Sequence, residues 1–176
     1  MSELWDVLDE NRNKTGRLHE RGKQMQKDEY HLVVHVWIVN DKNEFLISKR
    51  TPNKSYPNMW ECTGGSAIAG DDSLATAIKE VEEELGIILN PQNGFLFKQY
   101  KRCCEECGGG DFVDVWIFRQ NVDILSVVLQ PNETCDVMWA TKEQIDFMIE
   151  EKTFIGRELY SYIDELTKNC KNCLLF

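Results

Sequence analysis

Three glutamates spaced for one face of a helix are the residues in this chain best suited to chemistry. Glu80, Glu83 and Glu84 lie in the run GSAIAGDDSLATAIKEVEEELGI, residues 65–87. Because each helical residue turns by about 100°, these carboxylates share one arc, where like charges at i, i+3 and i+4 repel each other. A divalent cation would neutralise that repulsion, and carboxylate oxygens suit Mg²⁺. The spacing therefore predicts a metal site that can hold phosphate.

The same run predicts the helix that must carry these carboxylates. Gly64 and Gly65 precede it, and Gly86 stands where a left-handed cap would end it. Glu82 lies nearer the apolar edge and is interpreted as a surface residue. A separate apolar stripe would seal the core, and it consists of Leu74, Ile78, Val81 and Leu85.

The joint pattern resembles the Nudix box: a glycine, five residues, an acid, seven residues, then Arg-Glu-apolar-x-Glu-Glu-x-Gly-apolar. The resemblance implies that Glu80, Glu83 and Glu84 bind Mg²⁺, or Mn²⁺ in its place. The matching positions here are Gly65, Asp71, Lys79, Glu80, Val81, Glu83, Glu84, Gly86 and Ile87.

Two positions depart from the usual residues of the box. Asp71 replaces the loop glutamate, which shortens its reach, and Lys79 replaces the arginine before the first metal ligand. Lysine keeps the positive charge but lacks the planar fork that can brace a carboxylate through two parallel bonds. The three metal-ligand positions are intact, so an active site is expected.

The resemblance implies hydrolysis of a diphosphate. The metal would bridge diphosphate oxygens, neutralise the developing charge and lower the pKa of a bound water. Glu83 is the first candidate for the base that accepts the proton of the attacking water, with Glu80 and Lys79 as the other catalytic residues. An acid from another loop is the alternative, and the candidates are Asp111, Asp114 and Glu133. For Asp114, a site-facing and a solvent-facing position are both open.

Two basic residues near the box are candidate phosphate ligands. Arg50 would make a bidentate contact and Lys54 would act as a point charge, although both could instead be ordinary surface charges. His31 and His35 alternate on one predicted strand and therefore share a face. A structural role is favoured for His31.

The N-terminal segments, including HLVVHVWIVN and KRTPNKSYPNMW, resemble the Nudix subgroup related to type 1 isopentenyl diphosphate isomerase. In that relative, a histidine at the place of His31 binds metal and a lysine at the place of Lys54 contacts diphosphate. The loop WECTGGSAIAG argues against isomerase activity, because Gly64 and Gly65 stand where the catalytic cysteine is expected and no histidine follows. Cys62 is nearby, but its side chain should point in a different direction if this segment is extended.

Length and charge set broad limits. The chain has 176 residues, 42% of them hydrophobic, and we expect a single Nudix domain over residues 1–176, with 1–29 as an N-terminal extension and 30–176 as the core. A net charge of −10 argues against a nucleic-acid or anionic membrane surface. No apolar run approaches the ~20 residues of a membrane helix. We expect a cytoplasmic protein whose partner is a small-molecule diphosphate, with no prediction of oligomeric state.

The order of elements predicts an α/β protein, and the resemblance implies a Nudix-type α/β/α sandwich with a mixed sheet and an N-terminal β-hairpin. The expected hairpin covers residues 3–8 and 15–20. Further strands are expected at 31–39, 44–50, 95–101, 112–119 and 137–140. Thr141 is predicted to cap a helix over 142–150, with Gln144 in the capping-box position. A last helix is expected at 154–169.

Seven cysteines are expected to be reduced thiols. Two CxxC pairs, Cys104 with Cys107 and Cys170 with Cys173, leave a structural zinc site as the alternative. Free thiols are favoured.

Three functional classes remain open. The favoured one is a Mg²⁺-dependent hydrolase of a nucleoside diphosphate derivative or another organic diphosphate. The others are an isopentenyl diphosphate isomerase and a noncatalytic Nudix domain that senses a nucleotide. Phosphate release would separate the first class from the other two, and isomer formation would separate those two from each other.

Overall fold

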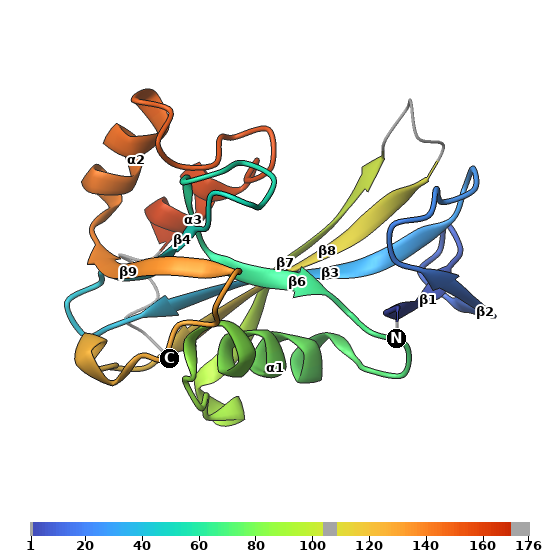
Figure 1. The fold of residues 1–176 in the computed structure, drawn as a ribbon, viewed down its shortest axis with the longest axis horizontal. Coiled ribbons are helices and arrows are strands. Elements are labelled where there is room, and N and C mark those ends of the chain that lie inside the picture. Colours follow the sequence, from blue (N-terminus) through green and yellow to red (C-terminus); the bar gives the residue numbers. More distant parts are fainter. Residues whose placement is uncertain (1, 104–108, 170–176) are drawn as a thin grey trace. The chain divides into compact units, whose positions relative to one another are not determined.

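A computed structural model describes residues 2–103 and 109–169 of the chain (Figure 1). The fold is α/β, as predicted, with a mixed sheet and helices. The chain divides into two compact units, each made of three separate segments. Unit 1 comprises Met1–Val36, Gly64–Glu82 and Ile88–Phe118, and unit 2 comprises Trp37–Thr63, Glu83–Ile87 and Arg119–Phe176.

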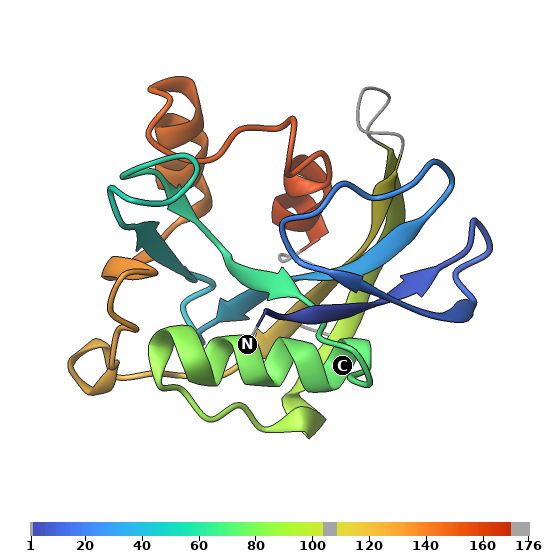
Figure 2. The ribbon, with the colours of Figure 1, turned by 45° about the vertical axis from the view of Figure 1, so that its right-hand side comes forward.

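Unit 1 begins with the predicted hairpin. Strands β1 (Leu4–Leu8) and β2 (Lys14–Glu20) pair antiparallel, and Leu8 of β1 pairs with Tyr30 of β3 (Tyr30–Val39) (Figure 2). The turn is held by Asp9, whose side chain accepts the backbone N–H groups of Asn11 and Asn13 at 2.9 and 2.8 Å. An aspartate that bonds the backbone two residues on is a common turn device, and it explains why the DENRNKTG segment forms this turn.

Two long strands complete the pairing in unit 1. Strand β7 (Gly94–Cys103) pairs antiparallel with β8 (Gly110–Arg119), and β8 also pairs with β3. Strand β6 (Thr63–Ser66), which the sequence did not predict, pairs with β3 as well. A short 3-10 helix (Pro91–Asn93) precedes β7. The predicted strands at 31–39, 95–101 and 112–119 are therefore confirmed.

Helix α1 (Ser73–Leu85) is the predicted helix of the box. Asp72 caps it, because its carboxylate accepts the backbone N–H of Ala75 at 2.8 Å. Gly86 ends it with a φ of +65°, a left-handed conformation that glycine adopts without strain. On the apolar stripe, Leu74 and Ile78 are partly buried and Val81 and Leu85 are buried, as is Ala77 beside them.

Unit 2 is organised around β4 (Phe45–Arg50). This strand pairs antiparallel with the end of β3, with β5 (Trp60–Glu61) and, along its whole length, with β9 (Thr134–Ala140). A second 3-10 helix spans Ile124–Ser126. Buried Trp37 packs against Phe45 and donates its indole N–H to the hydroxyl of Tyr162 at 3.0 Å.

Helix α2 (Lys142–Glu150) forms over the predicted residues. Its predicted capping box is confirmed. The hydroxyl of Thr141 accepts the backbone N–H of Gln144 at 3.3 Å, and the Gln144 side chain accepts the backbone N–H of Thr141 at 2.8 Å. These two bonds satisfy backbone donors that have no partner inside the helix.

The helix predicted at 154–169 is wrong over its first half, because α3 covers only Ile163–Asn169. Phe154 instead forms a parallel bridge with Trp60 of β5. Trp60 donates its backbone N–H to Thr153 at 2.8 Å and accepts that of Ile155 at 2.9 Å. Phe154 and Ile155 are buried, so pairing with a distant strand and burial of two large side chains outweigh local helix propensity.

Within the part of the chain that the structure describes, no helix is both long and apolar enough to cross a membrane.

We predict that Thr141→Ala lowers the free energy of unfolding by about 1 kcal/mol, because it removes the capping hydroxyl of α2. Urea unfolding followed by circular dichroism measures this change. Thr141→Ser is the matched control, because it keeps the hydroxyl and should lose much less stability. Equal stability of the alanine and serine variants would show that the cap contributes nothing.

Candidate active site

The three predicted metal ligands, Glu80, Glu83 and Glu84, all lie on α1. Glu80 and Glu84 are partly buried and Glu83 is exposed. Glu82 is exposed, as its interpretation as a surface residue required. Within residues 2–103 and 109–169, no three His, Cys, Asp or Glu side chains lie close enough together to form a preassembled metal site.

Gly65 leaves room for the carboxylate of Glu80. A Cβ atom placed on Gly65 would lie well inside 3.0 Å of the Glu80 carboxyl carbon and both of its oxygens, a distance that real Cβ atoms do not show. Gly65 therefore lets the Glu80 carboxylate lie against the backbone of β6, a position that a larger residue would force it to leave. Carboxylate oxygens are the donors that a hard divalent cation prefers, so the donor set and the space beside it fit such an ion.

The two residues that depart from the box pattern contact each other. The Lys79 ammonium lies 3.6 Å from a carboxylate oxygen of Asp71. Both side chains are partly exposed to solvent, so the ion pair adds little stability, about 0–1 kcal/mol. Its effect is to join the loop acid to the residue before Glu80, and the shorter aspartate still reaches its partner.

The N-terminal hairpin holds the loop that leads into α1. Gly70 donates its backbone N–H to the Asp6 carboxylate at 2.9 Å, and Ala69 donates to the backbone oxygen of Leu4 at 2.7 Å. An ion-paired hydrogen bond from Lys14 and the Gly70 bond both keep the pKa of Asp6 below its ordinary value. Sequence reasoning missed Asp6, because its partner lies 64 residues away.

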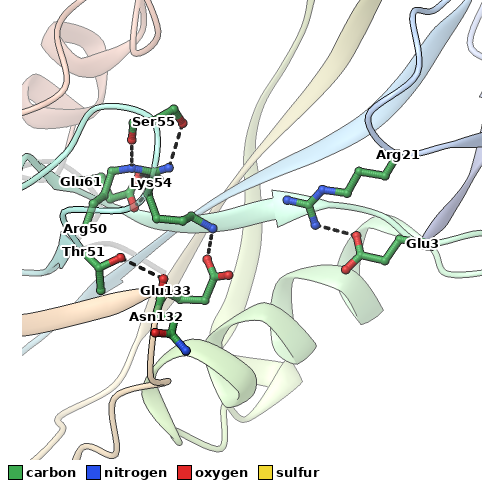
Figure 3. A network of polar contacts seen from close by, with 9 residues as sticks. All are labelled: Glu3, Arg21, Arg50, Thr51, Lys54, Ser55, Glu61, Asn132 and Glu133. Atoms are coloured by element: carbon green, nitrogen blue, oxygen red, sulfur yellow. Dashed lines mark hydrogen bonds and ion pairs between the residues drawn. The ribbon is translucent and has the colours of Figure 1, made fainter. Parts of the chain in front are cut away.

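Arg50 holds the loop between β4 and β5 (Figure 3). One guanidinium nitrogen donates to both carboxylate oxygens of Glu61 at 2.7 and 2.8 Å, and Nε donates to the backbone oxygen of Ser55 at 2.6 Å. Burial raises the pKa of Glu61, and the Arg50 charge opposes that rise. Arg50 thus already has partners inside unit 2, and its role as a phosphate ligand stays a prediction.

Lys54 forms an ion pair with Glu133 (Figure 3). Thr51, at the start of the same loop, fixes this arrangement by donating its hydroxyl to the backbone oxygen of Asn132 at 2.8 Å. The Thr51 backbone N–H also donates to the backbone oxygen of Glu133 at 3.1 Å. The structure therefore brings together a predicted phosphate ligand and one of the predicted acids.

Of the two orientations that the sequence left open for Asp114, the solvent-facing one is wrong. Its side chain is 0% exposed, pairs with Arg12 of the hairpin and accepts a hydrogen bond from Gln99 at 3.0 Å. A buried carboxylate needs such partners. Asp111 is likewise paired, with Arg102 donating from Nε at 2.8 Å.

His31 lies in a network of unit 1. Its Nδ1 is 3.2 Å from a carboxylate oxygen of Asp111, and its Nε2 is 3.3 Å from the hydroxyl of Ser66. The ring stacks on Trp5 of β1 with centroids 4.0 Å apart. Burial lowers the pKa of His31 more than the Asp111 charge raises it, which favours the neutral ring.

The thiol of Cys62 is buried, and burial raises its pKa. A thiol in this state is a poor nucleophile at neutral pH. The four cysteines of the CxxC pairs lie outside the described residues, so the zinc alternative is untested.

His35 generates a pH-dependent prediction. Burial, with a smaller contribution from the Arg102 charge, lowers its pKa from 6.5 to about 3. Between these values the unfolded chain binds a proton that the folded chain does not, so stability falls as the pH drops below 6.5, by up to about 1.4 kcal/mol per pH unit. We expect His35→Gln to flatten the decrease between about pH 6.5 and 5. Urea unfolding at several pH values tests this, and parallel profiles for the two proteins would contradict it.

Comparisons with known proteins agree with this geometry. The sequence is 37% identical over 172 residues to an uncharacterized Nudix hydrolase of Listeria monocytogenes, covering 97% of this chain and 96% of that protein. It is also 32% identical over 105 residues to isopentenyl-diphosphate Delta-isomerase 1 of Photorhabdus laumondii, covering 58% of this chain and 60% of that enzyme.

The crystal structure of DR0079 from Deinococcus radiodurans has the same fold, with a TM-score of 0.74 at 19% identity, covering 93% of this chain and 98% of that one. The NUDIX domain family matches residues 29–163, a range that runs from β3 to the start of α3. Because this match includes the whole box and the Listeria relative is alike along nearly its full length, the chain belongs to the Nudix family of hydrolases.

Proposed function

We propose that this chain hydrolyses a diphosphate linkage in a nucleoside diphosphate derivative or another organic diphosphate, with Mg²⁺, or Mn²⁺ in its place, as cofactor. The observation that carries the proposal is the space that Gly65 leaves for the Glu80 carboxylate on a helix that also bears Glu83 and Glu84. Three carboxylates on one helix suit a divalent cation.

Glu80, Glu83 and Glu84 would hold the metal ion. When bound, the ion would neutralise charge on the diphosphate and make the attacking water more acidic. Glu83 is the proposed base, because its side chain is exposed on α1 and is therefore accessible to a water molecule. Lys79, held by Asp71, would add a positive charge beside Glu80.

Arg50 and Lys54 are the proposed phosphate ligands. Each already pairs with a glutamate, Arg50 with Glu61 and Lys54 with Glu133. A phosphate oxygen would replace Glu133 as the partner of Lys54, because a dianionic group attracts the ammonium more strongly than a single carboxylate. Arg50 would contribute both a phosphate contact and, through Ser55, the shape of the loop.

The isomerase alternative draws support from the Photorhabdus relative. The geometry at Gly64 and Gly65, where the isomerase carries its catalytic cysteine, argues against this alternative. A side chain at Gly64 would collide with the backbone oxygen of Val34, and one at Gly65 would collide with Glu80. Position 64 therefore has no room for a cysteine, position 65 admits one only if the Glu80 carboxylate moves, and the nearby Cys62 is buried.

We predict that Glu83→Gln lowers kcat by about 10²-fold or more, because it removes the proposed base and one metal ligand. The substrate panel contains nucleoside diphosphate sugars, dinucleotides, nucleoside triphosphates and prenyl diphosphates, each with and without Mg²⁺. Release of phosphate and monophosphate is measured. Glu82→Gln is the matched control, since it makes the same change one residue away on an exposed position, and it should keep full turnover. Wild-type turnover in Glu83→Gln would disprove the proposed site.

We also predict that Gly65→Ala lowers turnover by at least about 10-fold, because the new Cβ must displace the Glu80 carboxylate. The test is a double-mutant cycle with Glu80→Gln. If Gly65→Ala acts through Glu80, the double variant should lose no more activity than Glu80→Gln alone. Losses that multiply would mean that Gly65 acts on something other than Glu80.

A further inference from the structure

Unit 1 contains a serine, a histidine and an aspartate that contact one another in that order across three strands. Strand β3 pairs with both β6 and β8. Ser66 lies on β6, His31 on β3 and Asp111 on β8. All three residues belong to the same compact unit, and the chemistry proposed above gives this cluster no role.

The imidazole of His31 lies between the other two side chains. Its Nε2 is 3.3 Å from the hydroxyl oxygen of Ser66, and its Nδ1 is 3.2 Å from Oδ1 of Asp111. This is the order of a nucleophile, a base and a carboxylate that orients the base. Both distances are at the long end for hydrogen bonds, which is usual at catalytic groups before a substrate binds.

Neighbouring side chains hold the imidazole and the carboxylate. Arg102 donates from Nε to Oδ2 of Asp111 at 2.8 Å, which leaves Oδ1 facing His31. The indole of Trp5 stacks on the His31 ring, with centroids 4.0 Å apart and planes 8° from parallel. The groups that would act on the serine are therefore positioned before a substrate arrives.

The proton of the imidazole belongs on Nδ1. Burial keeps the pKa of His31 below its ordinary value, so the ring is neutral at neutral pH. A carboxylate beside Nδ1 favours the tautomer that carries its proton there. Nε2 is then an acceptor to which the Ser66 hydroxyl can donate. A serine that donates to a neutral imidazole is activated as a nucleophile.

Two buried nitrogen atoms of this cluster lack an aligned hydrogen bond to any residue that the structure describes. They are Nδ1 of His31 and the indole nitrogen of Trp5. His31 is only 9% exposed, and an unsatisfied polar group in such a place calls for an explanation, such as a catalytic role. A small rotation would direct Nδ1 at Asp111, and the oxygen of a ligand would satisfy the indole N–H.

The surroundings of Ser66 indicate the kind of ligand. Its side chain is partly exposed, so a substrate can reach the hydroxyl. Because Gly65 and Ser66 are successive residues of β6, Ser66 points away from the side on which Gly65 faces the Glu80 carboxylate. Arg102 is already paired with Asp111 and is not available to hold a phosphate. The cluster therefore suits a neutral carbonyl group.

We propose that Ser66 and His31 form a second catalytic site that hydrolyses carboxylic esters, with Asp111 as the residue that positions His31. Oγ of Ser66 forms a bond to the carbonyl carbon, and its proton passes to Nε2 of His31. The bond to the alcohol oxygen then breaks, and Nε2 gives the proton to that oxygen. Water attacks the acyl-serine and loses a proton to Nε2, which returns it to Ser66 as the acid leaves.

A fluorophosphonate probe tests the nucleophile, because its phosphorus forms a bond to an activated serine oxygen with loss of fluoride. The full chain is incubated with the probe in EDTA, and mass spectrometry of the intact protein and of its peptides follows the reaction. We expect one label per chain, on Ser66, and none in Ser66→Ala. His31→Gln removes the base and should lower the labelling rate by about 10²-fold or more.

Ser126→Ala is the matched control. Ser126 is an exposed serine whose hydroxyl donates to the backbone oxygen of Asp123 at 2.7 Å, so this variant should be labelled at the wild-type rate. Hydrolysis of p-nitrophenyl acetate in EDTA provides a second readout. Wild type and Ser126→Ala should release a burst of p-nitrophenol as the acyl-serine forms, and Ser66→Ala should release none.

Asp111→Asn tests the positioning role. We expect the limiting labelling rate to fall by about 10-fold or more, because the base is no longer oriented. The probe concentration that gives half of that rate should change by less than about twofold, since the probe still binds. Circular dichroism checks that each variant is folded. A change in the half-maximal concentration alone would give Asp111 a structural role and remove it from the proposal.

The outcomes decide the proposal without reference to diphosphate turnover. Label on Ser66 that depends on His31 supports it. Wild type that takes up no label, or that is labelled at another residue, overturns it. Labelling of Ser66 at the wild-type rate in His31→Gln overturns it as well. If His31→Gln does not fold, the label on Ser66 of wild type decides, because a serine without a base is a weak nucleophile.

Discussion

Repulsion among the carboxylates of α1 is a cost that packing elsewhere on the helix must offset. Glu80, Glu83 and Glu84 oppose the helix that carries them by a few tenths of a kcal/mol per pair. Burial of Val81 and Leu85 on the other face contributes about 1.5–3 kcal/mol each. Packing of the apolar stripe therefore exceeds the repulsion, and the helix forms although three carboxylates share one of its faces.

The positions of these carboxylates could be predicted from the sequence, because helical geometry relates residues only three or four apart. The same holds for the capping box of α2, whose two partners are neighbours in the chain. Local patterns also gave the hairpin and the long strands to within a few residues.

What the sequence could not predict depends on partners far apart in the chain. The segment 154–162 reads as helix, but its pairing with Trp60 spans about ninety residues and leaves no periodic signal. Nothing in the sequence around Asp6 distinguishes it from other strand residues, because its partner Gly70 lies 64 residues away. Gly65 belonged to the predicted pattern, yet only the structure shows that its purpose is space for Glu80.

The proposed phosphate ligands Arg50 and Lys54 illustrate how an acidic protein can hold cations for an anionic ligand. Each is paired with a carboxylate in its own unit, so neither presents a bare charge to the solvent. Singly charged anions must compete with Glu61 or Glu133 for these residues, whereas a diphosphate carries more negative charge and would attract the two cations more strongly. Paired cations of this kind favour selectivity over raw attraction.

The hydrogen bonds that Leu4 and Asp6 accept from Ala69 and Gly70 give the N-terminal hairpin a structural role in the loop before α1. In the sequence, the hairpin precedes the box and shares none of its pattern. Here its backbone and one of its carboxylates determine where the loop before α1 lies. The hairpin is therefore part of the framework that positions the box, and a domain boundary drawn between them would cut the hydrogen bonds that hold this loop.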